Sequence, residues 1–282
     1  MTFHSTSPIH AFTDGEPRFG FLFSPAGGPV EEGADPSAAK ASLVIVAHGS
    51  DRDAAGMLEA MREGLGGRAV SILAPLFASE IDGEDHSDGY KFLVSAGIDY
   101  ISVTKSMIAA ASRLSGGFGS VYLFGFSGGA QFAHRYALFC ASELSGLVVA
   151  SPGNVTLLDE TLEWWPGLGG AAAAIGRATD ITSLRKLPVG IIIGSEDRAG
   201  GLVARPAGAP HGSLYEGVAG ASRLERAHSL SLSFRSHDIQ TVFHEIEGVG
   251  HELRPVTLKA AELISRWIDA GECQTSLIKK GE

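Results

Sequence analysis

Cysteine is scarce in this chain of 282 residues, and long apolar runs are lacking. The two cysteines, Cys140 and Cys273, are too few for a disulfide framework, and we expect a reducing, intracellular compartment. No segment approaches the roughly 20 consecutive apolar residues that cross a bilayer. Residues 1–12 have neither the basic nor the apolar region of a secretory signal. These absences predict a cytoplasmic protein without a membrane span.

Basic residues are also fewer than acidic residues. The chain has 22 Lys and Arg residues against 32 Asp and Glu residues, which gives a net charge of −10 with neutral histidines. Nucleic acids and anionic membrane surfaces attract basic proteins, so we expect neither as the main partner. The hydrophobic content of 44% against 19% charged residues is typical of a globular chain with a substantial core.

Sequence motifs for common cofactors are missing or misplaced. No Gly-x-x-x-x-Gly-Lys-Ser/Thr is present, which excludes a P-loop. The glycine-rich residues 116–119 lead into an expected strand, whereas a dinucleotide loop follows one. The acidic residues 82–88 lack the sixth-position glycine of an EF-hand loop. We therefore expect no metal ion and no organic cofactor.

Apolar runs typical of buried strands alternate with amphipathic helical patterns along the chain. The expected strands are 43–47, 69–74, 121–126, 146–150, 189–193 and 241–246, with a strand or hairpin at a sheet edge over 18–23. The expected helices are 54–64, 99–113, 128–142, 221–234 and 255–269. This alternation predicts an α/β fold, with a mainly parallel twisted sheet and helices on both faces.

We expect the whole chain, residues 1–282, to form one domain. Residues 155–186 interrupt the alternation with two tryptophans, several glycines and a short alanine run. This segment is expected to be a short cap inserted between two strands of the sheet.

The chain is organised around Gly125-Phe126-Ser127-Gly128-Gly129, which follows an apolar strand and precedes a helical pattern. This Gly-x-Ser-x-Gly motif is typical of a nucleophile elbow, a sharp strand-to-helix turn that exposes a serine. The small residues two positions either side of Ser127 allow the turn and the helix to pass close together. Ser127 is the candidate nucleophile, and the N–H of Gly128 is a candidate oxyanion donor. The alternative is a glycine-rich turn that contains a serine by chance, in a chain with 37 glycines.

Three other strand ends carry polar residues, in the regions where ligands bind to open α/β sheets. They are residues 48–50 (His-Gly-Ser), Asp197 and His251, and the order Ser127, acid, histidine is that of α/β hydrolases. With these motifs the sequence resembles the α/β-hydrolase superfamily over about residues 18–270. The resemblance is closest to serine esterases of the dienelactone-hydrolase or polyester-depolymerase type.

Activation of a serine hydroxyl requires a base and an acid that orients the base. Among ten histidines, His251 fits best as the base because it follows the last strand and can fold back over the sheet. Asp197 is the favoured acid, with Glu196 as the alternative. The resemblance implies that the backbone N–H of Ser50 is the second oxyanion donor, with Asp51 as the alternative.

Trp164, Trp165 and Arg52 are the three candidates for substrate binding, and Arg254 is considered with Arg52. Trp164 and Trp165 either line an acyl or aromatic pocket or pack the cap onto the sheet. Arg52 and Arg254 flank the expected site and either bind a substrate carboxylate or form surface ion pairs. Sequence alone leaves these alternatives open.

The resemblance and the motifs together predict a serine hydrolase that cleaves a small to medium carboxylic ester or lactone through an acyl-enzyme. The expected partner is therefore a small-molecule ester, and the resemblance makes a homodimer an option. One alternative is an amidase or peptidase that uses the same triad. Another is a protein of the same fold that binds a ligand without turnover or catalyses lyase or oxygenase chemistry.

Overall fold

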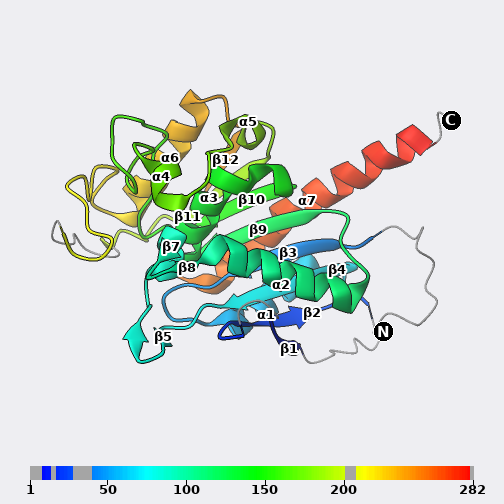
Figure 1. The fold of residues 1–282 in the computed structure, drawn as a ribbon. Helices are drawn as coiled ribbons and strands as arrows, with labels where there is room; N and C mark the ends of the chain where they lie inside the picture. Colours follow the sequence, from blue (N-terminus) through cyan, green and yellow to red (C-terminus); the bar gives the residue numbers. More distant parts are fainter. Residues whose placement is uncertain (1–7, 14–16, 28–39, 201–207, 280–282) are drawn as a thin grey trace.

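An eight-stranded sheet forms the centre of the structure, a computed structural model that describes residues 8–13, 17–27, 40–200 and 208–279, with side chains to residue 271. The strand order is β1-β2-β4-β3-β9-β10-β11-β12 (Figure 1). β1 and β4 each pair antiparallel with β2, and the remaining neighbours pair in parallel. The predicted α/β class with a mainly parallel sheet is confirmed.

The elements of the sheet lie close to the predicted ranges. The strands of the sheet are β1 (Ile9–Phe12), β2 (Gly20–Ser24), β3 (Ser42–Ala47), β4 (Val70–Leu76), β9 (Val121–Phe126), β10 (Gly146–Ala150), β11 (Val189–Gly194) and β12 (Thr241–Ile246). Short hairpins follow β4, formed by β5 (Glu80–Ile81) with β6 (Glu84–Asp85) and by β7 (Val94–Ser95) with β8 (Ile98–Asp99). Sequence reasoning missed β1, a four-residue segment with no buried side chain.

Helices cover both faces of the sheet, as predicted. The helices are α1 (Ala54–Leu65), α2 (Tyr100–Ser115), α3 (Gly128–Cys140), α4 (Ala171–Ile175), α5 (Ile181–Leu184), α6 (Arg223–Ser236) and α7 (Leu253–Lys279), with 3-10 turns η1 (Gly89–Phe92) and η2 (Ala141–Glu143). α7 was expected to end at residue 269, and its continuation to Lys279 places Cys273 in a helix rather than a tail. The red C-terminal part of α7 extends beyond the sheet in Figure 1. No helix in the described ranges is long and apolar enough to cross a membrane.

The alternation of side chains along the strands divides the core into two layers. In β3, Leu43 and Ile45 join the layer with α2, α3 and α6, whereas Val44 and Val46 join the layer with α1 and α7. All four side chains are fully buried. A strand buried on both faces requires a continuous apolar run, and this requirement explains why the central strands could be predicted from sequence.

The segment between β10 and β11 packs against α3 through a buried arginine. Arg135 donates hydrogen bonds to Thr156 Oγ1 at 2.9 Å and to Asn154 Oδ1 at 2.8 Å. Its guanidinium lies 4.8 Å from the ring centre of Phe92 and 5.0 Å from that of Trp165. Burial lowers the pKa of Arg135 to about 9. The hydrogen bonds and the aromatic faces compensate for the water that this cation loses on burial.

Candidate active site

Ser127 occupies the turn between β9 and α3 in a strained backbone conformation, with φ 54° and ψ −111°. Its N–H donates to the carbonyl of Ala150 at 2.9 Å, which fixes the turn against β10. A Cβ added to Gly125 would lie 2.0 Å from the carbonyl oxygen of Gly129, and one added to Gly129 would lie 1.9 Å from that of Ala47. The two glycines of the motif are therefore steric requirements of this turn.

Replacement of Gly129 by alanine tests this requirement. We expect the free energy of unfolding to fall by roughly 3 kcal/mol, because a Cβ facing the carbonyl oxygens of Ala47 and His48 forces the start of α3 away from the end of β3. Gly27→Ala is the matched control, since an added Cβ there meets nothing within 4 Å, and a change within about 0.5 kcal/mol is expected. Urea unfolding measures both. Equal stability of the two variants would contradict the steric account of the elbow.

The structure brings Ser127, His251 and Asp197 together from three strand ends. His251 Nε2 lies 3.0 Å from Ser127 Oγ, and His251 Nδ1 lies 2.7 Å from Asp197 Oδ2. The imidazole stacks on Phe126, with ring centres 4.8 Å apart. Glu196 instead points outward, with a side chain that is 59% exposed. Of the two acids that sequence left open, Asp197 is the one placed against the imidazole.

The carboxylate of Asp197 is fully buried but well compensated. Burial by itself raises its pKa, but the hydrogen bond from His251 and the nearby charges of His251 and Arg223 outweigh that effect, and the pKa is lowered from its usual value. Arg223 Nη1 donates to Asp197 Oδ1 at 3.2 Å. Asp197 therefore stays ionised and keeps its second oxygen for the imidazole.

Ser50 and Gly128 lie beside each other at the proposed oxyanion position. The Oγ of Ser50 is 3.2 Å from the point that a Cβ of Gly128 would occupy. Gly128 is the first residue of α3, and its N–H has no acceptor within the helix. The positive end of the helix dipole adds to the attraction for an anion at this point. Ser50 and Asp51 both line the cavity, and the preference for the Ser50 N–H comes from the resemblance.

His48 shapes the loop that carries Ser50. It is fully buried, its Nδ1–H donates to the carbonyl of Gly49 at 2.8 Å, and its Nε2 accepts the N–H of Phe77 at 3.1 Å. Burial is the main reason that its pKa falls to about 4. This neutral imidazole is fully engaged by the backbone and holds the turn after β3.

The triad opens onto a cavity of about 420 Å³. The cavity is lined by residues 49–51, Phe126, Ser127, Gln131, Gly153, Arg223, His251 and Leu253. None of these belongs to residues 155–186, so the expected cap segment does not line the cavity. Sequence reasoning missed Gln131 and Arg223. A capping pattern, Ser222 with Glu225, marks the start of α6 in the sequence but does not reveal where Arg223 points.

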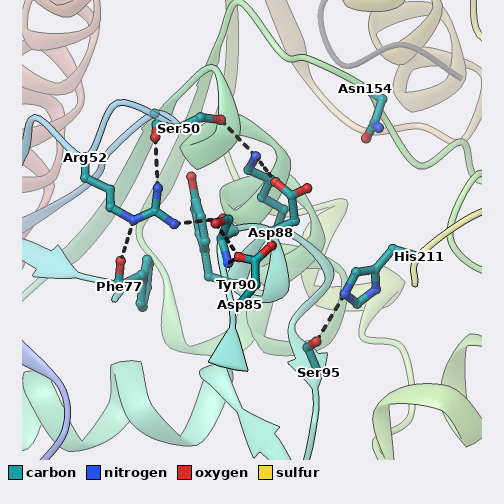
Figure 2. A network of polar contacts seen from close by, with 12 residues as sticks. Ser50, Arg52, Phe77, Asp85, Asp88, Tyr90, Ser95, Asn154 and His211 are labelled. Carbon is teal, nitrogen blue, oxygen red and sulfur yellow. Dashed lines mark hydrogen bonds and ion pairs between the residues drawn. The ribbon is translucent and has the colours of Figure 1, made fainter. Parts of the chain in front are cut away.

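The three substrate-binding candidates lie outside this lining. Arg52 donates to the carbonyls of Ser50 at 2.9 Å, Phe77 at 3.1 Å and Ser87 at 2.9 Å (Figure 2). Through these bonds the guanidinium holds the loop. Arg52 itself has a positive φ of 59° and is part of the turn.

The two tryptophans take part in packing. The indole of Trp165 is 4% exposed and donates to the carbonyl of His211 at 2.7 Å. Trp164 meets Phe139 of α3 edge to face, with ring centres 5.7 Å apart. Of the two alternatives for these residues, packing of the segment onto the fold is the one that the contacts favour. Arg254 lies beyond the lining and pairs with Glu63 at the surface.

The acidic segment that sequence analysis singled out forms the β5–β6 hairpin and leads into η1. In the described ranges, no group of three or more His, Cys, Asp or Glu residues is arranged to hold a metal ion. Asp85 accepts hydrogen bonds from the N–H and the hydroxyl of Ser87, and these bonds lower the pKa of the carboxyl.

Several solved structures of hydrolases share this fold. Poly(aspartic acid) hydrolase-1 from Sphingomonas sp. KT-1 aligns with a TM-score of 0.71 at 17% identity, over 91% of this chain and 98% of that one. A poly(3-hydroxybutyrate) depolymerase from Bordetella parapertussis aligns with a TM-score of 0.70 at 21% identity, over 95% and 91%. An S-formylglutathione hydrolase from Agrobacterium tumefaciens aligns with a TM-score of 0.59 at 12% identity, over 92% and 94%.

No protein-family model and no curated protein matches the sequence. The structural likeness nevertheless covers nearly the whole of each chain. Together with the strand order, this likeness establishes the α/β-hydrolase fold, as the sequence resemblance predicted. At identities this low the likeness defines the fold, and the chemistry has to be argued from the site.

Proposed function

We propose that this chain is a serine hydrolase that cleaves a carboxylic ester or a lactone through an acyl-enzyme. The observation that carries the proposal is the line of contacts from Ser127 Oγ through His251 to Asp197, with distances of 3.0 and 2.7 Å, at the wall of an open cavity. The solved neighbours are themselves described as hydrolases or depolymerases, which supports this reaction class.

The hydrogen bonds of His251 fix its role in the first step. With Nδ1–H donated to the ionised Asp197, the lone pair of Nε2 faces Ser127 and accepts its proton during attack on the ester carbonyl. The carbonyl carbon gains the Ser127 Oγ bond, and its oxygen becomes an oxyanion. The imidazolium then returns the proton to the leaving alcohol as the ester bond breaks, which leaves the acyl group on Ser127.

The second half of the cycle repeats this chemistry with water. His251 takes a proton from water as the water attacks the acyl carbonyl, and the acid leaves when the proton returns to Ser127. The N–H groups of Gly128 and Ser50 would stabilise the oxyanion in both halves. These steps use side chains and backbone groups of this chain throughout.

The dimensions of the cavity bear on the substrate. A volume of about 420 Å³ is within the usual range for small-molecule sites, and supports a small or medium substrate. Arg223 lines this cavity while it also contacts Asp197, so positive charge lies beside the site. The neighbours include a poly(3-hydroxybutyrate) depolymerase and an S-formylglutathione hydrolase, which support an ester substrate, and a poly(aspartic acid) hydrolase, which supports the amidase alternative.

Labelling with a fluorophosphonate probe, located by peptide mass spectrometry, tests the nucleophile. We expect covalent modification at Ser127 in the folded protein and hydrolysis of short p-nitrophenyl esters. Modification at another serine would contradict the assignment.

The alternatives give different results in the same assay. An amidase or peptidase would be labelled at Ser127 but would cleave p-nitroanilides at least as fast as the matching esters. A protein that binds a ligand without turnover would resist labelling and hydrolyse neither series. Lyase or oxygenase chemistry would leave both series intact as well, and would then be sought with other substrates.

A further inference from the structure

A buried lysine lies behind the proposed oxyanion position. Lys91 of η1 is 1% exposed, and its Nζ donates to Ser50 Oγ at 2.8 Å and pairs with Asp88 (Figure 2). The ion pair with Asp88 compensates for the burial of the ammonium, but it does not require a contact with Ser50. None of the steps proposed above uses this lysine. Its place beside Ser50 therefore calls for a separate explanation.

The chemistry of the two groups fixes the direction of their hydrogen bond. An ammonium has three donors and no acceptor, so Ser50 Oγ must accept from Lys91, and its own hydrogen must point elsewhere. Two destinations lie close to that hydrogen. One is the hydroxyl of Tyr90, which itself donates to the carbonyl of His48 at 3.2 Å. The other is the cavity that Ser50 lines together with Ser127 and His251.

We propose that the hydroxyl of Ser50 is a third oxyanion donor, and that Lys91 holds and polarises it. The inference rests on the proposed hydrolase function and adds a side-chain donor to the two backbone N–H groups. As negative charge develops on the substrate oxygen, the hydroxyl hydrogen turns from Tyr90 to that oxygen. Its Oγ continues to accept the charge-assisted bond from Lys91, which makes the hydroxyl a stronger donor. Ser50 is then a catalytic residue, and Lys91 is a positioning residue that acts through it.

The surroundings of Ser50 support a fixed loop. Arg52 holds the loop from the other side through the carbonyls of Ser50, Phe77 and Ser87. Arg135 donates to the carbonyl of Lys91 at 2.6 Å, which anchors the backbone of η1. A donor that is held in place before the reaction needs no reorganisation when the oxyanion forms.

Ser50→Ala and Lys91→Met measure the proposed donor. We expect kcat for p-nitrophenyl acetate to fall about 10- to 100-fold in each variant, because an oxyanion donor acts only on the developing charge. KM should stay within about twofold, since the ground-state ester gains little from this donor. Affinity for an alkyl boronic acid, which forms a tetrahedral adduct on the nucleophile, should fall by a similar factor.

The double variant shows whether Lys91 acts through the hydroxyl of Ser50 or independently of it. If Lys91 acts through the hydroxyl of Ser50, the double variant should lose no more than Ser50→Ala alone, within about threefold. The proposal would be overturned if the loss of kcat in the double variant equalled the product of the two single losses. A kcat for Ser50→Ala equal to that of the wild type would overturn it as well. Ser50→Ala tests it even where Lys91→Met folds poorly, since alanine removes only an oxygen.

Two controls complete the experiment. Lys105→Met removes another lysine that forms an ion pair, in this case with Glu143. Lys105 lies in α2 and its ion pair does not involve Ser50, so kcat should not change. Circular dichroism of each variant shows whether it is folded. If wild-type protein neither hydrolyses esters nor accepts the fluorophosphonate label, the proposed function itself fails. A labelled, active wild type with an unaffected Ser50→Ala variant would refute only the third donor.

Discussion

Ser127→Ala is expected to reduce kcat for ester hydrolysis by at least about 10⁴-fold while the protein remains folded. Alanine has no oxygen to attack the carbonyl, so the acyl-enzyme cannot form. What remains is the catalysis that the oxyanion donors and His251 provide for direct attack by water. The measurement is initial-rate kinetics on p-nitrophenyl acetate, with circular dichroism to confirm the fold.

The strain at Ser127 makes the fold of this variant informative in its own right. Its φ of 54° lies in a region that alanine tolerates no better than serine, so the turn keeps the same conformational cost. Its hydroxyl contacts His251 and does not hold the turn, which depends on the backbone bond to Ala150. We therefore expect stability within about 1 kcal/mol of the wild type.

A matched serine variant controls for general effects. Ser115→Ala removes a hydroxyl that donates to the carbonyl of Ala111 at the end of α2, and its activity should equal that of the wild type. Retention of more than about a tenth of wild-type activity by Ser127→Ala would sink the nucleophile assignment. Loss of activity in both variants would indicate a problem of folding rather than of chemistry.

The parts of the site that sequence could predict are those governed by local rules. The elbow depends on small residues two positions either side of Ser127, and steric contact of Gly125 and Gly129 with backbone explains that spacing. The positions after strands β9, β11 and β12 converge because parallel strands end at one edge of the sheet. Sequence order and strand ends were therefore enough to select Ser127 and His251 and to narrow the acid to Asp197 or Glu196, and the structure brings Ser127, His251 and Asp197 together.

Features that depend on contacts between distant segments could not be predicted. Glu196 and Asp197 are adjacent, and only the turn after β11 decides which carboxylate faces inward. Arg52 is close to Ser50 in the sequence, but two of the three hydrogen bonds of its guanidinium go to the carbonyls of Phe77 and Ser87, which lie 25 and 35 residues away. Lys91 reaches Ser50 across 41 residues from a 3-10 turn without a sequence signature.

The protein is expected to lose stability steeply as the pH falls, because of the buried His134. This residue is fully buried in α3, where its Nδ1–H donates to the carbonyl of Ala130 at 2.7 Å and its Nε2 accepts the N–H of Thr156 at 2.9 Å. Burial, with a smaller contribution from the charge of Arg135, lowers its pKa to about 3. A protonated imidazole could not accept the N–H of Thr156.

The direction of the effect follows from proton linkage. In the unfolded chain a histidine has a pKa of about 6.5, so below that pH the unfolded state binds a proton that the folded state excludes. The contribution of neutral His134 is fully present above pH 6.5 and is lost progressively as the pH falls toward 3. Its full loss is on the order of 5 kcal/mol. His48, with a pKa of about 4, adds to the same slope.

His134→Gln isolates this contribution. The variant should be less stable than the wild type at pH 7.5, because the ring packing is lost, but its stability should fall less between pH 6.5 and pH 4. His228→Gln is the control, since that side chain is 51% exposed and its replacement removes no buried imidazole. Urea unfolding at a series of pH values gives the free energies. Equal slopes for His134→Gln and wild type would show that the buried imidazole does not control acid stability.

The acid unfolding bears directly on the pH dependence of activity. Unfolding driven by His134 reduces hydrolysis at low pH, and the His134→Gln substitution lessens this contribution. A rate profile of that variant that still falls in acid, at pH values where circular dichroism shows folded protein, would have a cause other than unfolding. The stability measurement is therefore needed before any acidic limb of the rate profile is assigned to the proposed triad.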